Sequence, residues 1–177
     1  METDNRAVPC FLFASLVTSY PDLDFDKFAL ELLLDGELEI PTELRDQLSA
    51  ILRDETILDD LRSEYIDLFD RGRVANPLYE TEYGRDRALV KGNELADIAG
   101  FYKAFGLEIG HADSKNEMLD HVAVELEFYS LLLLKTVHLE EQHDQTGIDI
   151  VNDARRKFLM DHLGRFVAAI ADRPGVQ

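Results

Sequence analysis

Hydrophobic residues recur along this chain in steps of three and four, and the longest such pattern lies between Asn116 and Lys135. This spacing places apolar side chains on one face of a helix. The leucine run 131–134 then extends the apolar surface around almost the whole circumference. A helix of this kind is covered by neighbours on several sides. We therefore predict a central helix from about Glu117 to Gln142.

Similar apolar stripes predict further helices on both sides of the central one, and Pro and Gly residues mark their ends. No stretch alternates with a period of two for long enough to be a strand. The chain of 177 residues suits one domain. The prediction is therefore an all-α protein, with one compact bundle of about seven or more helices over residues 1–177. Besides the central helix, the stripes cover residues 8–19, 24–34, 44–52, 56–69, 93–105 and 151–170.

The charge of the chain is strongly negative. Asp and Glu number 36 against 18 Lys and Arg, which gives a net charge of −18. Such a field repels nucleic-acid phosphates and anionic lipids, so we expect neither as a partner. It favours a basic partner, such as a segment rich in Arg or Lys. The same charge also suits solubility or a salty cytoplasm, and the charge alone does not separate these readings.

The single cysteine and the N-terminus bear on the compartment. Cys10 allows no internal disulfide, and its apolar surroundings predict a buried thiol. No apolar run approaches the ~18 residues needed to cross a bilayer. The first ten residues carry acids instead of a basic region before an apolar core, so we expect no signal peptide. These features predict a cytoplasmic protein without stable membrane insertion.

Ionisable residues gather where the central helix is expected to begin. Glu117, Asp120, His121 and Glu125 lie there, and on a regular helix His121 and Glu125 share a face one turn apart. One interpretation is structural: the acids complement the helix dipole, and His121 bonds to Glu125 or Glu117. The other is a binding site. Both interpretations stay open at this stage.

A second concentration of unusual chemistry lies between two predicted helices, at residues 71–87. Gly72, Asn76-Pro77 and Gly84 are turn residues, yet the segment also holds two tyrosines, two glutamates and four arginines. Ordered loops of this composition often carry function. We predict an ordered loop that either binds a partner or is anchored to the core by its tyrosines.

Two other function classes remain as alternatives. The sequence lacks a Gly-rich phosphate-binding loop. Di-iron helical bundles use two Glu-x-x-His pairs, and this chain offers one, Glu140 with His143. A helical-bundle metal-binding enzyme is therefore one alternative. A generic acidic helical adaptor protein is the other.

Three stretches, in the same order, resemble the TorD/DmsD/NarJ family of molybdoenzyme chaperones. Glu117-Met-Leu-Asp-His121, leading into Glu125-Leu-Glu-Phe128, is similar to the Glu-x-x-Asp-His motif of that family. The first 60 residues are similar only in being helical. The other stretches are Tyr65–Phe69 with Asn76–Gly84, similar to the aromatic-x-x-Leu-Phe and Pro-Tyr-Glu-Ser-x-Tyr segments, and Phe158–Leu163, similar to the closing Phe-Leu-x-x-His-Leu segment.

The resemblance implies a cytoplasmic chaperone with no catalytic activity and with no cofactor or metal of its own. Its partners would be the catalytic subunit of a molybdoenzyme of the dimethyl sulfoxide reductase superfamily, that subunit's twin-arginine leader, and the export machinery. It would act as a monomer or a domain-swapped dimer. We expect acidic residues to meet the arginines of the leader, and aromatic residues to meet its apolar part. The candidate binding residues are Asp120, His121, Glu117, Glu125, Tyr79, Glu80, Tyr83 and Phe69.

Overall fold

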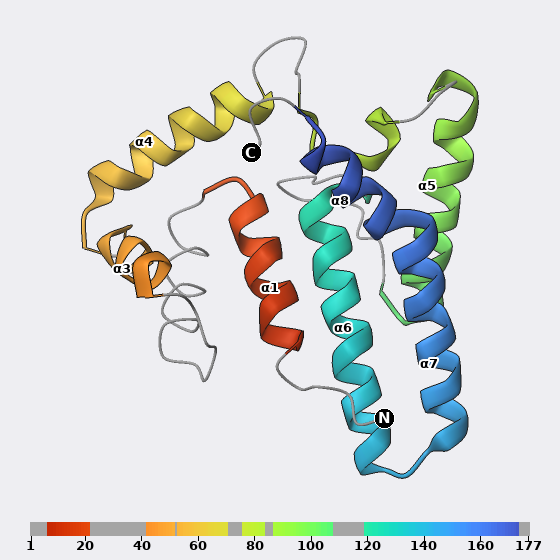
Figure 1. Ribbon diagram of the computed structural model, residues 1–177. Helices are drawn as coiled ribbons and strands as arrows, with labels where there is room; N and C mark the ends of the chain where they lie inside the picture. The colour runs from red at the N-terminus through yellow and green to blue at the C-terminus, as the bar shows by residue number, and fades with distance from the viewer. Residues whose placement is uncertain are drawn as a thin grey trace.

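Helices fill almost the whole of the described chain (Figure 1). The computed structural model describes residues 7–21, 42–51, 53–70, 76–83, 87–107 and 119–173. These ranges contain no β-strand, only an isolated bridge between Tyr79 and His121. The all-α prediction is confirmed. The elements are α1 (Ala7–Thr18), α3 (Thr42–Ile51), α4 (Glu55–Tyr65), α5 (Arg87–Ala104), α6 (Val122–Glu141), α7 (Gln145–Phe158) and α8 (Gly164–Ala171), with the π-helices η1 (Ile66–Asp70) and η3 (Leu159–Leu163) and the 3-10 helix η2 (Glu80–Glu82).

Helix α6 runs through the middle of the bundle, between α1 and α7 (Figure 1). The ring of Phe128 lies 4.8 Å from that of Phe158 in α7 and 4.7 Å from that of Tyr102 in α5. On another side, Phe11 of α1 lies 4.6 Å from Tyr129. The expected central helix is confirmed. The buried core around it consists of Leu78, Ile98, Tyr102, Val122, Leu126, Phe128, Tyr129, Leu132, Leu133, Val151, Phe158, Leu163 and Phe166.

Helix α1 packs along α6, and its orientation differs from what we expected. The Ser15 hydroxyl donates to the backbone carbonyl of Ala123 at 2.9 Å, and Leu16 is buried. Cys10 is exposed, so the prediction of a buried thiol is wrong. Helix α1 is apolar on nearly every side. Because of this, the spacing of its residues does not reveal which face meets α6.

Helix α6 begins at Val122, after the predicted start. Leu119 and Asp120 form a turn, and His121 is the N-cap residue with an extended backbone. Glu117 lies outside the described residues. The helix ends at Glu141, and two residues later His143 takes a left-handed backbone conformation, with φ 57°. The extended backbone at His121 is available to pair with another segment.

The predicted last helix is interrupted. Helices α7 and α8 continue one another through η3, a wider turn in which the Gly164 N–H donates to the carbonyl of Leu159. A Cβ at position 164 would collide with that oxygen, which explains the glycine. The turn places both His162 and Leu163 in the interior. The prediction already counted this rod of α7, η3 and α8 as one helix, and the described residues nevertheless contain fewer helices than the seven or more expected.

The remaining elements agree with the predicted stripes in part. Helix α4 passes into η1 where one regular helix was expected over 56–69. The helix expected over 24–34 lies outside the described residues. The predicted loop 71–87 is described over 76–83, and α5 begins at Arg87, earlier than expected. Within the described ranges, no helix is long and apolar enough to span a bilayer.

Candidate functional site

The segment 76–83 pairs with the turn that precedes α6. The Val122 N–H donates to the carbonyl of Leu78 at 2.9 Å, and the Glu80 N–H donates to the carbonyl of Asp120 at 2.8 Å. These bonds flank the antiparallel bridge between Tyr79 and His121. Two stretches singled out separately in the sequence therefore meet in space, and the rest of the site is built on this contact.

Asp120 holds the segment 76–83 in place through hydrogen bonds with Thr81. Its side chain is fully buried, and one carboxylate oxygen accepts from the Thr81 hydroxyl at 2.6 Å and from the Thr81 N–H at 3.2 Å. The Thr81 side chain is 1% exposed. Hydrogen bonds to a buried charge contribute about 1.5–3 kcal/mol each. Asp120 therefore holds η2 in place and does not face solvent.

His121 caps α6 as a neutral ring. Its Nδ1 accepts from the Ala123 N–H at 3.2 Å, so the ring proton lies on Nε2. Burial lowers the pKa of His121 to about 4, although the charge of Asp120 acts in the opposite direction. The ring packs edge-on against Tyr79, with centroids 5.1 Å apart. As an N-cap, His121 bonds to the backbone and not to Glu125.

Glu125 is a fully buried acid in the first turn of α6. As a carboxylate it would find no hydrogen-bond donor within the described ranges. Burial, the charges of Glu80 and Asp120, and a hydrogen bond with Glu80 raise the pKa of Glu125 to about 10. Glu125 is therefore a neutral carboxylic acid at neutral pH, and it can donate its proton to Glu80.

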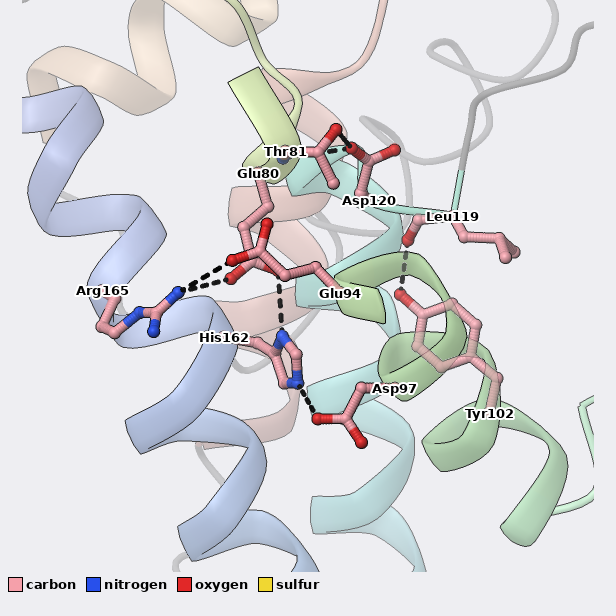
Figure 2. A network of polar contacts seen from close by, with 9 residues as sticks. All are labelled: Glu80, Thr81, Glu94, Asp97, Tyr102, Leu119, Asp120, His162 and Arg165. Atoms are coloured by element: carbon pink, nitrogen blue, oxygen red, sulfur yellow. Dashed lines mark hydrogen bonds and ion pairs between the residues drawn. The ribbon is translucent and has the colours of Figure 1, made fainter. Parts of the chain in front are cut away.

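Glu80 connects the segment to the last helix through His162 (Figure 2). The carboxylate of Glu80 lies 3.0 Å from His162 Nδ1, and Asp97 of α5 lies 3.1 Å from His162 Nε2. Burial alone would lower the pKa of His162, but the hydrogen bonds and charges of Glu80 and Asp97 raise it overall. His162, with one carboxylate at each ring nitrogen, thus ties three elements together.

Two further residues, Arg165 and Tyr102, complete the network. Arg165 of α8 lies 3.5 Å from Glu80 and 3.7 Å from Glu94 (Figure 2). The Tyr102 hydroxyl donates to the carbonyl of Leu119 at 2.9 Å, which holds α5 against the turn before α6. Burial raises the pKa of Tyr102, so the hydroxyl keeps its proton.

Sequence reasoning did not include His162, Arg165 and Asp97 among the site residues. His162 lies within the closing Phe158–Leu163 stretch, so the resemblance could have pointed to it. Asp97 and Arg165 carried no comparable signal, because they belong to ordinary polar faces of helices. Their roles depend on the meeting of α5, η3 and α8 in space.

The other predicted residues lie at different distances from the network. Tyr83 is half-buried; its hydroxyl donates to the carbonyl of Pro77 at 2.8 Å, and Arg173 lies over its ring, 4.9 Å from the centroid. Tyr79 is half-buried beside His121. Phe69 lies in η1, where its ring is 5.1 Å from that of Tyr65 and packs against the hydrophobic core. Glu117 lies outside the described residues.

The geometry gives no support to the metal-binding alternative. Across the described ranges, no group of three or more His, Cys, Asp or Glu side chains is placed to hold a metal ion. Glu140 and His143 lie at the opposite end of α6 from the buried acids.

Comparisons with known proteins agree with this architecture. A sequence model of the family described as nitrate reductase delta subunit matches residues 37–172. The crystal structure of a protein assigned to redox enzyme maturation, from Archaeoglobus fulgidus, is 26% identical in sequence, with a TM-score of 0.55. The likeness covers 90% of this chain and 96% of that one. No curated protein matches the chain.

Proposed function

Because the chain belongs to the nitrate reductase delta subunit family of redox enzyme maturation chaperones, we propose that it serves one molybdopterin oxidoreductase in the cytoplasm. It binds the twin-arginine-type leader of the catalytic subunit, the subunit before cofactor insertion, or both. Binding assists insertion of the cofactor and delays export. The chain catalyses no reaction of its own.

One observation carries the proposal: the stretches that resemble the chaperone family converge on Glu80. The segment 76–83 contains Glu80, the turn 119–121 pairs with that segment, and the stretch 158–163 supplies His162. A cluster of buried acids, assembled from three distant parts of the chain, is unusual for a purely structural core because burying charge is costly. This convergence supports a shared binding role.

The charge of the chain suits the proposed partner. A leader combines a basic stretch with an apolar stretch that readily forms a helix. The net charge of −18 attracts the first part over a distance of about 10 Å at moderate salt. Exposed apolar residues such as Met160 and Val167 on the last rod offer contact to the second part.

The predicted site residues divide by their exposure. Asp120, His121 and Glu125 are buried, and we assign them the task of holding the segment 76–83 in its binding shape. Tyr79 and Tyr83 are half-buried and can contact the apolar part of a leader. A direct contact between Asp120 and a leader arginine would require this segment to move. Glu117 and Phe69 stay proposed contacts of the same leader.

The test is a binding measurement with a labelled peptide copy of the leader of a molybdoenzyme encoded beside this protein. Fluorescence anisotropy at low and high salt should give micromolar or tighter binding that weakens as salt rises. A peptide whose two arginines are replaced by glutamine is the matched control and should bind at least about tenfold more weakly. The apo catalytic subunit provides a second ligand. If neither the leader nor the subunit binds, the proposed function is wrong.

A further inference from the structure

A hollow of about 640 Å³ opens on the surface directly outside the buried network. It lies between α5 and the rod formed by η3 and α8, and His162 forms part of its floor. Its volume falls within the usual range for ligand sites of about 300–1,000 Å³. The hollow therefore reaches the buried network at His162. Its lining residues are Asn93, Glu94, Ala96, Asp97, Asp161, His162 and Arg165.

The charges around the hollow favour a cation. Glu94, Asp97 and Asp161 line it, and Glu80, outside the lining, is joined to His162 by a hydrogen bond (Figure 2). Among the lining residues, only Arg165 and His162 can carry positive charge against the three lining carboxylates. Because His162 is already held between Glu80 and Asp97, negative charge remains in excess at the opening.

Arg165 occupies a position that suits a guanidinium group, but its own contacts with the carboxylates there are long. Its side chain is 62% exposed, and it approaches Glu80 Oε1 at 3.5 Å and Glu94 Oε1 at 3.7 Å. Charge-assisted N–H···O bonds are usually about 2.7–2.9 Å long. Glu80 is 3% exposed, and its Oε1 receives no hydrogen bond from an N–H group of the described chain. Apart from the proton that Glu125 can share with Glu80, the group that approaches this buried oxygen within the described residues is therefore the distant guanidinium of Arg165.

We propose that the hollow receives an arginine side chain of the client segment, which takes the place of Arg165 on Glu80 and Glu94. This inference rests on the proposed function and specifies where the basic part of the partner binds. A guanidinium group offers five N–H donors in a plane, so it can serve several carboxylates at once. A lysine ammonium is a point charge and fits this arrangement less well. Until the partner arrives, Arg165 acts as a stand-in that offsets part of the negative charge of the site.

The first test removes lining carboxylates that lie outside the Glu80–His162–Asp97 chain. In the variant Glu94→Gln/Asp161→Asn, Kd for the leader peptide should rise about tenfold or more. The control Glu141→Gln/Asp149→Asn removes the same charge from exposed positions at the far end of the bundle and should change Kd by less than about twofold. Equal changes in both variants would mean that only overall charge matters, and would overturn the inference.

The second test removes the side chain of Arg165, which occupies the position proposed for the client's arginine. Arg165→Ala should tighten leader binding about three- to tenfold, because Glu80 and Glu94 become free for the incoming arginine. Arg156→Ala is the matched control, since Arg156 is 64% exposed on α7 and pairs with Asp153. A circular dichroism spectrum of each variant verifies folding, and the carboxylate variants still test the inference if Arg165→Ala does not fold.

The outcomes separate this inference from the proposed function. Tight binding by the wild-type protein that no hollow variant alters would overturn the inference and leave the chaperone function standing. Absence of leader binding by the wild-type protein would overturn the arginine site. A leader in which lysines replace the arginines should bind about tenfold more weakly, and equal binding would also count against it.

Discussion

The most specific prediction concerns the proton on Glu125. A pKa raised from 4.5 to about 10 means that the folded protein keeps a proton that the unfolded chain loses between these values. Folding stability therefore falls as pH rises through this range, by about 1.4 kcal/mol per pH unit. Glutamine has the shape of the neutral acid and no proton to lose. In Glu125→Gln this part of the pH dependence should disappear.

The titration of neighbouring groups determines the pH range in which the effect of Glu125 on stability can be measured separately. His121 titrates in the unfolded chain near 6.5 and in the folded protein at about 4, so above about pH 7 it contributes nothing further to the slope. The raised pKa of His162 lowers stability with rising pH in both proteins, so its effect cancels in the comparison. Between about pH 7 and about pH 9, wild-type protein should lose about 3 kcal/mol more stability than Glu125→Gln.

The assay is urea unfolding followed by far-ultraviolet circular dichroism at several pH values. Glu127→Gln removes the same group from an exposed position on the same helix and should follow the wild-type slope. Equal slopes for wild-type protein and Glu125→Gln would refute the reasoning, because Glu125 would then be ionised in the folded protein. A higher stability of Glu125→Gln at neutral pH, by an amount on the order of 3 kcal/mol, is the companion result.

Three further substitutions test other parts of the fold. Gly164→Ala should destabilise the protein by about 1–3 kcal/mol in urea unfolding, because the new Cβ collides with the Leu159 carbonyl in η3. His143→Gly should raise the thermal midpoint, by a gain of about 1 kcal/mol, since φ 57° is strained for any residue but glycine; an unchanged midpoint would argue against that backbone. Thr81→Val should cost about 1.5–3 kcal/mol by leaving Asp120 without its 2.6 Å hydroxyl donor, whereas Thr81→Ser should retain most of the stability.

The sequence predicts the helices well where one face is clearly apolar. The central helix is found because apolar residues continue around its circumference, which only a covered helix tolerates. The same reasoning fails for α1, because an evenly apolar helix does not reveal the side on which Cys10 lies. It also fails at η3, because a pattern with regular spacing cannot show one additional residue in a turn.

The sequence predicts several individual residues of the candidate site, but not the contacts between them. Glu80, Asp120 and His121 were identified by their resemblance to chaperone motifs, and Glu125 by its place in a charged cluster. Their mutual contacts could not be predicted, because the bridge between Tyr79 and His121 joins segments that no local pattern relates. Nor could sequence reasoning show that Asp120 is covered by Thr81 and so lies out of direct reach of a partner.

The bond between Glu80 and His162 also has a consequence for synthesis of the protein. The two residues are 82 positions apart, so Glu80 leaves the ribosome long before its histidine is made. At roughly 5–20 residues per second, the delay is about 4–16 s. Throughout this time α5 and α6 can form locally, but the glutamate has neither His162 nor Arg165 beside it. The hollow therefore takes shape only when translation of the last rod is complete, so an unfinished chain lacks both the hollow and the ion pairs beside it.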